Sequence, residues 1–80
     1  MKLENHVLYG RPTCPYCGKV FRIMEKYGIE CDVVDTNDPE NLEKLEELTG
    51  RRTVPCLFID GEPMWESSDI IVYMKSKLKD

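Results

Sequence analysis

The stretch TCPYCGK, residues 13–19, holds two cysteines separated by a proline and a tyrosine. Such a pair can be a metal clip, a structural disulfide or a reactive dithiol. Pro15 favours a helix that begins here, because a proline at the first helical position gives up no intrahelical hydrogen bond. The Cys14 sulfur then faces free backbone N–H groups and the positive end of the helix dipole, which stabilise a thiolate. We therefore predict a lowered pKa for Cys14, the nucleophile, and a higher pKa for the less exposed Cys17.

The sequence supports a zinc site or a hydrolytic enzyme less well than a reactive dithiol. A structural zinc site needs two more ligands at suitable spacing, but Cys31 and Cys56 are isolated in strand-like segments. The single histidine, His6, stands at the start of the first expected strand, where it gives little support for a cysteine–histidine hydrolase. We expect Cys31 and Cys56 to be small buried fillers, with a third redox thiol at Cys56 as the alternative.

The rest of the chain supplies the strands and helices that position the cysteine pair. Periodicity and turn signals predict strands at 6–9, 29–35, 55–60 and 63–65, a helix from the cysteines to Gly28, a helix capped by Asp38 that ends at Gly50, and a last helix capped by Ser67 or Ser68. Leu42, Leu45 and Leu48 are the expected buried stripe of the second helix. The order β-α-β-α-β-β-α makes the first two strands parallel, whereas the Asp60-Gly61 hairpin adds antiparallel strands. We therefore predict an α/β fold with a mixed sheet and helices on both faces.

Composition and charge exclude several function classes. The chain is expected to form one small soluble domain, residues 1–80. A net charge of -4 argues against nucleic acid, which needs a clustered basic surface. No apolar run approaches the roughly 20 residues that span a bilayer, and the opening residues do not resemble a secretory signal. We expect a cytoplasmic protein without nucleic-acid or membrane partners, in which four cysteines do not form a disulfide framework.

Three motifs together resemble a glutaredoxin of the dithiol type: CPYC after the first strand, TGRRTVP before the third, and the hairpin leading to ESSDI. The resemblance covers nearly the whole chain and implies a thioredoxin fold, with a four-stranded mixed sheet flanked by three helices. It implies an enzyme, a thiol–disulfide oxidoreductase, that uses glutathione as co-substrate and holds no metal or tightly bound cofactor. The expected partners are glutathione and proteins with disulfides or glutathione mixed disulfides, and we expect a monomer.

The resemblance also implies a division of roles and a glutathione groove. The first cysteine of the family attacks the disulfide, and the second cysteine or glutathione then releases the product. Arg11, three residues before the first cysteine, is expected to stabilise the thiolate or to bind a glutathione carboxylate, with a plain surface charge as the alternative. Tyr16 is expected to line the groove, with a plain exposed aromatic side chain as the alternative. Thr53, Val54 and Pro55 form the TVP segment, in which the proline is cis and the Val54 backbone pairs with glutathione like an added strand.

The segment before the last helix differs from the usual family pattern. Many glutaredoxins carry a Gly-Gly pair and then an Asp pair before the last helix, whereas this chain has WESSD at 65–69. That segment resembles the ES segment of glutathione transferase N-terminal domains. We expect Ser67 and Ser68 to bind the γ-glutamyl carboxylate through backbone N–H groups and a hydroxyl, and Glu66 to meet the ammonium group. Simple helix capping by the serines is the alternative.

These departures leave alternatives to a glutathione-dependent reductase. Leu42 stands near the position of the family's glutamine for the glycine carboxylate, so Arg51 or Arg52 is the expected substitute. A redoxin reduced by thioredoxin reductase is one alternative. A glutathione-binding iron–sulfur carrier is another, although such family members usually carry a single cysteine in CGFS. A stand-alone transferase-like domain is a third, and the intact second cysteine argues against it.

Overall fold

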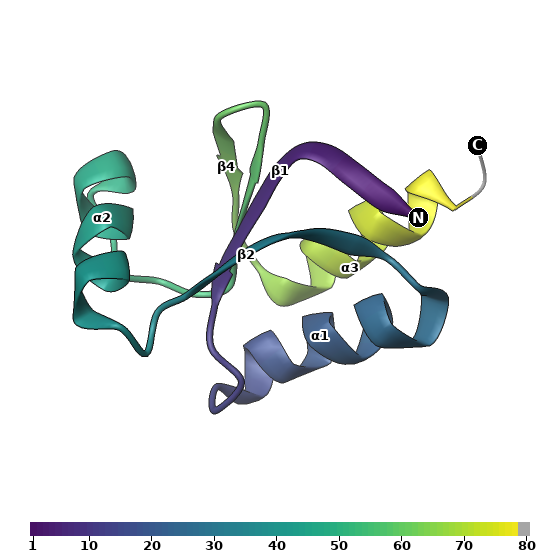
Figure 1. Cartoon of the computed structure of the whole chain (residues 1–80), viewed down its shortest axis with the longest axis horizontal. Helices are drawn as coiled ribbons and strands as arrows, with labels where there is room; N and C mark the ends of the chain where they lie inside the picture. Colours follow the sequence, from purple (N-terminus) through teal and green to yellow (C-terminus); the bar gives the residue numbers. More distant parts are fainter. Residues whose placement is uncertain (79–80) are drawn as a thin grey trace.

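The computed structural model describes residues 1–78, so residues 79 and 80 of the predicted 1–80 domain lie outside the described residues. The elements follow the predicted order: β1 (Lys2–Gly10), α1 (Pro15–Tyr27), β2 (Glu30–Asp35), α2 (Pro39–Thr49), β3 (Cys56–Ile59), β4 (Glu62–Met64) and α3 (Ser67–Lys77). The strands form one sheet in the order β2-β1-β3-β4 (Figure 1). β2 runs parallel to β1, whereas β3 and β4 pair antiparallel, so the predicted mixed sheet is confirmed.

Local sequence signals set the bounds of the first two helices. A proline occupies the first turn of both α1 and α2, where its missing N–H costs nothing. Asp38 caps α2, since its carboxylate accepts a hydrogen bond from the N–H group two residues later at 3.0 Å. Gly28 and Gly50 end the two helices in the left-handed conformation, with φ values of 65° and 77°. These bounds agree with the sequence prediction.

The first strand is longer than the sequence predicted. β1 begins at Lys2 rather than at residue 6, and its pairing with β2 shifts register between Lys2 and Val7. Asn5 lies within this irregular part with a φ of 60°. The apolar pattern marks only the regular half of the strand, because the irregular half is mostly polar and exposed.

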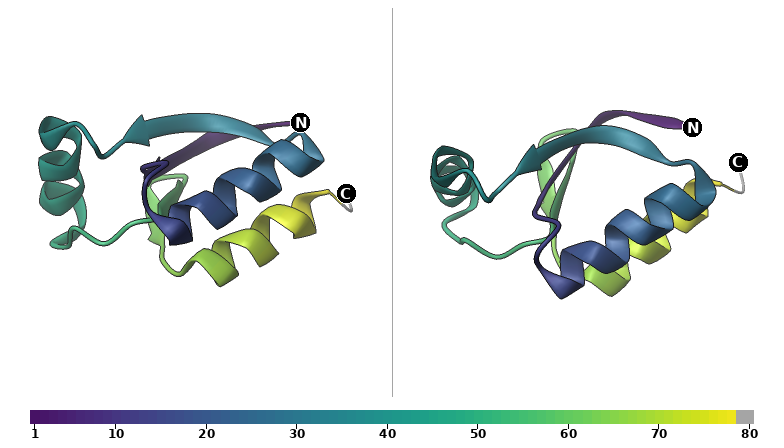
Figure 2. Two further views of the ribbon diagram at one scale, coloured as in Figure 1. Left: turned by 90° about the horizontal axis from the view of Figure 1, so that it is seen from below. Right: turned by 60° about the horizontal axis from the view of Figure 1, so that its bottom comes forward.

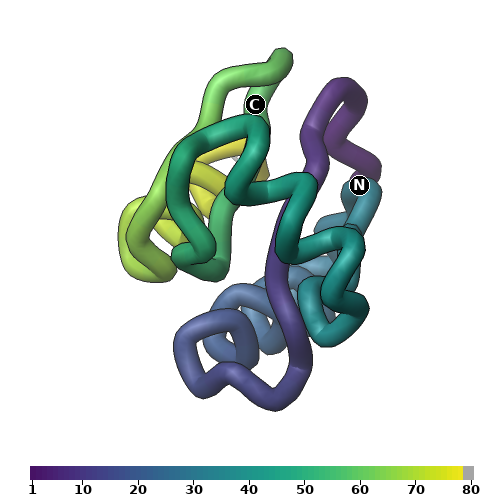
Figure 3. The backbone as a smooth tube through the Cα atoms, turned by 90° about the vertical axis from the view of Figure 1, so that its left-hand side faces the viewer, coloured from purple at the N-terminus to yellow at the C-terminus, as the bar shows by residue number. Residues whose placement is uncertain are grey.

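Two layers of helix cover the sheet unequally. α1 and α3 lie side by side on one face, whereas α2 alone covers the other (Figure 1 and Figure 2). Figure 3, viewed from the α2 side, shows β1 running through the middle of the molecule. The larger core lies under α1 and α3 and contains Leu3, Leu8, Val20, Met24, Ile29, Leu57, Ile70 and Met74. The smaller core lies under α2 and contains Tyr9, Leu45, Cys56 and Phe58.

The predicted leucine stripe of α2 is wrong in part. Leu45 is completely buried, but Leu42 is half-buried and Leu48 is 56% exposed. Residues three apart drift by about 60° around an α-helix, because each residue advances by about 100°. A single helix that touches the sheet along a narrow line therefore buries only the middle leucine of the three.

No helix within residues 1–78 combines the length and apolar content that a membrane span requires.

Candidate active site

The two cysteines of the CPYC motif occupy the predicted positions at the start of α1. Cys14 is the N-cap residue, with extended backbone angles, and is partly exposed. Its backbone N–H donates to the Arg11 carbonyl at 3.2 Å, and its own carbonyl accepts the first helical bond, from Gly18, at 2.8 Å. Cys17 lies in the first turn and is 1% exposed. Only the first sulfur is therefore open to a disulfide in solution.

The helix N-terminus acts on Cys14 as predicted. The backbone N–H of Cys17 is the main cause of a lowered pKa of the Cys14 thiol, and it outweighs the raising effect of partial burial. The N–H of Tyr16, the Cys17 thiol and the positive charge of Arg11 also lower this pKa. The Cys14 side chain makes no capping hydrogen bond. The N–H groups therefore stabilise its thiolate chiefly through their dipoles at the start of the helix.

Burial acts in the opposite direction on Cys17. It is the main cause that raises the pKa of the Cys17 thiol to about 11, and the neighbouring Cys14 contributes to this rise. The packing around this sulfur is tight, since a Cβ atom added at Gly10 would lie 3.1 Å from Cys17 Sγ. The predicted order of the two pKa values is therefore confirmed, and its cause is the difference in burial and helix position.

A groove of about 520 Å³ adjoins the CPYC turn. Three segments that are distant in sequence form it: the first turns of α1, the loop before β3 and the start of α3. The lining residues are Tyr16, Lys19, Thr53, Val54, Pro55, Glu66, Ser67 and Ser68. The residues predicted to bind glutathione lie in this groove, with the exception of the three arginines; of these, Arg11 acts on the Cys14 thiol instead.

The TVP segment has the predicted backbone. The Val54–Pro55 peptide bond is cis. Within residues 1–78, neither the N–H nor the C=O of Val54 takes part in a backbone hydrogen bond, since β3 pairing begins at Cys56. Both groups are thus available to an extended segment placed in the groove.

The start of α3 differs from the prediction. Glu66, not a serine, is the N-cap residue, and Ser67 is already the first helical residue. The chain enters the helix through a φ of 71° at Glu66, and the Glu66 side chain makes no capping bond. The Ile70 N–H donates to the Glu66 carbonyl at 3.0 Å, so the N–H groups before it have no partner in the helix. Ser67 and Ser68 therefore bring unpaired N–H groups to the groove.

The expected arginine substitutes are not in the groove. Arg52 forms an ion pair with Glu46, and Arg51 lies over the Trp65 ring at 5.5 Å from its centroid. The groove's cation is Lys19, which the sequence interpretation missed. The sequence holds a signal for Lys19, because it follows Tyr16 by three positions and residues three apart share a face of a helix.

Comparison with known proteins places the chain in a family. Its residues 7–64 match the glutaredoxin family model. The chain belongs to the glutaredoxin family. It is 32% identical to human Glutaredoxin-1 over 77 residues, which cover 88% of this chain and 73% of that protein. It is 33% identical to Arabidopsis thaliana Glutaredoxin-C4 over 69 residues, 81% of this chain and 51% of the relative.

Solved structures confirm the predicted thioredoxin fold. The holo form of glutaredoxin C1 from Populus tremula x tremuloides superposes with a TM-score of 0.66 at 26% identity, covering 91% of this chain and 75% of that one. The trimeric glutathione transferase TDR1 of Leishmania superposes with a TM-score of 0.76 at 27% identity, covering 92% of this chain. This chain spans only 17% of that transferase. The function class that follows from the family is a glutathione-dependent thiol–disulfide oxidoreductase.

Of the remaining cysteines of this glutaredoxin, Cys56 is buried and Cys31 is half-buried. Cys56 is completely buried beside Tyr9, Leu45 and Phe58, and burial raises the pKa of its thiol to about 11. Burial also raises the pKa of Cys31. Both findings agree with the expected filler role. Within residues 1–78, no three His, Cys, Asp or Glu side chains gather closely enough to hold a metal ion.

His6 has a structural role in β1. It is 9% exposed, and its Nδ1–H donates to the Glu4 carbonyl at 2.6 Å. In the neutral ring, Nε2 accepts from the Tyr73 hydroxyl at 2.7 Å, and the two rings stack. With both nitrogens engaged, His6 ties β1 to α3.

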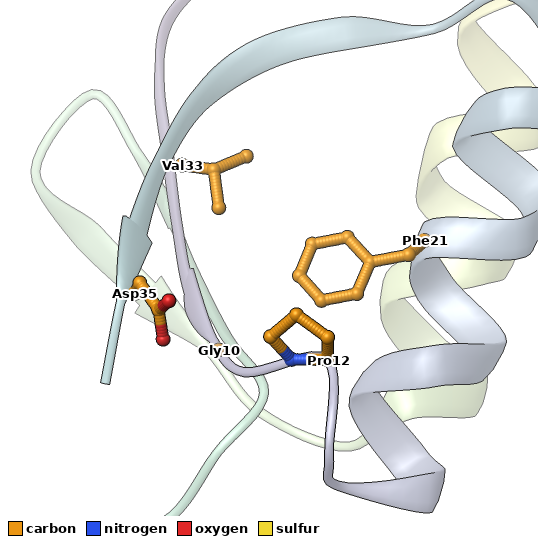
Figure 4. Close-up of a pocket in the computed structure, with 5 residues that line it drawn as sticks. All are labelled: Gly10, Pro12, Phe21, Val33 and Asp35. Carbon is orange, nitrogen blue, oxygen red and sulfur yellow. The ribbon is translucent and has the colours of Figure 1, made fainter. Parts of the chain in front are cut away.

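A second hollow, of about 300 Å³, opens between α1 and the edge strand β2. Figure 4 shows the rings of Phe21 and Pro12 next to each other, with Val33 and Asp35 of β2 and the backbone of Gly10 around them. None of the predicted site residues lines this hollow. Gly10 borders both the hollow and Cys17, so it forms the wall between the buried thiol and this surface.

Proposed function

We propose that this protein reduces glutathione mixed disulfides and protein disulfides through Cys14, with glutathione as the electron donor. The observation that carries the proposal is the groove beside the CPYC turn: Tyr16 of this turn lines the groove, Cys14 of the same turn has a lowered pKa, and the segments that form the groove suit a γ-glutamyl tripeptide. Glutathione itself is the substrate that would occupy this groove.

The reaction with a glutathionylated protein takes two exchanges. The Cys14 thiolate attacks the glutathione sulfur, the protein–glutathione S–S bond breaks, and the protein leaves as a thiolate that takes up a proton. A glutathione thiolate then attacks the glutathione sulfur bound to Cys14. Glutathione disulfide leaves, and Cys14 returns as a thiolate, which its helix position stabilises.

Protein disulfides require the second cysteine. Attack by Cys14 gives a mixed disulfide with the protein, and the Cys17 thiol then loses its proton and attacks the Cys14 sulfur. The reduced protein leaves, and two glutathione molecules reduce the Cys14–Cys17 disulfide. Because burial keeps Cys17 protonated at neutral pH, glutathione from solution competes with it as the resolving thiol.

The groove offers a partner for each part of glutathione. The free N–H and C=O of Val54 suit the backbone of the cysteinyl residue. The unpaired N–H groups of Ser67 and Ser68, at the positive end of α3, suit the γ-glutamyl carboxylate, and Glu66 suits the ammonium group. Tyr16 would form the outer wall, since its side chain is 60% exposed.

Turnover of a glutathionylated peptide tests the proposal, with electrons supplied by glutathione and glutathione reductase or, separately, by thioredoxin reductase. We expect turnover with glutathione, complete loss in Cys14→Ser, and retained deglutathionylation in Cys17→Ser. The Cys17→Ser variant should lose the dithiol reduction of a protein disulfide. Turnover that depends on Cys14 only with thioredoxin reductase would show that glutathione is not the donor, and no turnover in either system would refute the reductase function.

We also propose a monomeric protein of the cytoplasm, as the sequence predicts. Analytical ultracentrifugation and cell fractionation test these two points. A coloured, dimeric protein after purification would instead favour the iron–sulfur carrier.

A further inference from the structure

We propose that Lys19 is a specificity residue of the groove, where its ammonium group binds the α-carboxylate of the γ-glutamyl unit. This inference rests on the proposed glutathione function and adds a side-chain partner to the N–H groups of α3. Lys19 would act by binding and would take no part in the exchange of sulfur atoms.

The charges that line the groove carry the inference. Lys19 is the cation among the lining residues, and Glu66 is the anion. The ion pair found within residues 1–78 is Arg52–Glu46, so neither groove charge has an oppositely charged partner within 4.0 Å among these residues. One unpaired positive and one unpaired negative side chain thus face the same space from two different helices.

A zwitterionic group matches this arrangement best. The γ-glutamyl end of glutathione carries one carboxylate and one ammonium group on the same carbon, so it can neutralise both side chains at once. The glycine end carries only a carboxylate and would leave Glu66 without a partner. Lys19 also shares the groove with Ser67 and Ser68, at the end of the site assigned to the γ-glutamyl unit.

Tyr16 holds Lys19 in this position. The Lys19 Nζ lies over the Tyr16 ring at 5.5 Å from its centroid, a cation–π contact between neighbours on one helix face. The contact keeps the long side chain along the groove wall, which lowers the entropy that binding would cost. Glu66, which lines the same groove, has a φ of 71°, a conformation that is uncommon for non-glycine residues.

The test uses three mixed-disulfide substrates made from one peptide: with glutathione, with γ-glutamylcysteine and with cysteinylglycine. The kcat/KM for the mixed disulfide is measured at fixed glutathione, because in a two-exchange reaction it reports only the first exchange. We expect Lys19→Gln to lower kcat/KM about tenfold for glutathione and γ-glutamylcysteine, the size of one charge-assisted hydrogen bond. The cysteinylglycine substrate should be unaffected, and Lys19→Arg should retain most of the activity.

Lys26→Gln is the matched control, because Lys26 lies over the Tyr27 ring at 5.4 Å on the same helix and does not line the groove. It should leave all three substrates unchanged. The Lys19→Gln loss should also shrink at high salt, as screening weakens a charge contact at an exposed site. The substitution is made at Lys19 rather than Glu66, whose unusual backbone would confuse binding with folding.

Three outcomes would overturn the inference. An equal loss on all three substrates would indicate a general structural effect, and no loss on any would show that Lys19 does not bind substrate. A loss with cysteinylglycine but not with γ-glutamylcysteine would move Lys19 to the glycine carboxylate. If the wild-type protein turned over none of the substrates with glutathione, the proposed function itself would fail, which is a distinguishable result.

Discussion

Leu45 and Leu48 lie one turn apart on α2, but only Leu45 packs against the sheet. Leu45 is completely buried among Tyr9, Cys56 and Phe58, whereas Leu48 is 56% exposed. We therefore predict that Leu45→Ala destabilises the protein strongly and that Leu48→Ala hardly changes its stability. The pair is well matched, because both substitutions remove the same atoms and change the intrinsic helix propensity of α2 by the same amount.

The size of the effect follows from the packing. Truncation of a fully buried leucine to alanine costs about 2–5 kcal/mol, and an exposed substitution usually changes stability by less than about 0.5 kcal/mol. α2 is the single helix on its face of the sheet, so it can move inward and partly close the cavity. We therefore expect about 2–3 kcal/mol for Leu45→Ala. In a domain of this size that is a large share of a total of about 4–12 kcal/mol.

Urea unfolding of the reduced protein measures the difference, with the fluorescence of Trp65 as the signal. Trp65 packs against the same small core, so its emission should also report a local change in this region. Equal losses of stability in both variants would refute the reasoning. They would mean that Leu48 is buried as the sequence predicted, which requires a different rotation of α2. No loss in Leu45→Ala would show that this core contributes little to the fold.

Three further predictions concern the cysteines and their surroundings. Gly10→Ala should cost about 1–3 kcal/mol by overpacking, because the new Cβ would lie 3.1 Å from Cys17 Sγ; unchanged urea unfolding would contradict the tight packing. Burial raises the pKa of Cys17 and Cys56 to about 11, so above the unfolded value of 9.0 the folded state keeps protons that the unfolded state loses. Stability should then fall between pH 9 and 11, by about 1.4 kcal/mol per pH unit and thiol; Cys56→Ala should remove the share of this one thiol from the slope, and an undiminished slope would disprove the assignment. With limiting iodoacetamide at pH 6, mass spectrometry should find Cys14 alkylated first because the pKa of its thiol is lowered; earlier labelling of Cys17 would reverse the roles.

Local rules explain why much of this protein could be predicted from the sequence. Helix starts at proline and Asp38, and helix ends at glycine, depend on contacts within a few residues of the chain. The lowered pKa of Cys14 is of the same kind, because its main causes are N–H groups two and three residues away. The TVP and ESSD segments were found through the family resemblance, since no local rule connects residues 53–55 with residues 14–17.

The tertiary structure decided what depends on segments distant in sequence. The rotation of α2, which buries Leu45 and exposes Leu48, follows from a narrow contact with the sheet that periodicity alone does not specify. Lys19 becomes a groove residue only because α1 packs beside α3, and Glu66 becomes the N-cap because the chain leaves β4 through a positive φ. The sequence by itself thus determined the reactive thiol and its helix, while packing between elements determined which charges face the substrate groove beside it.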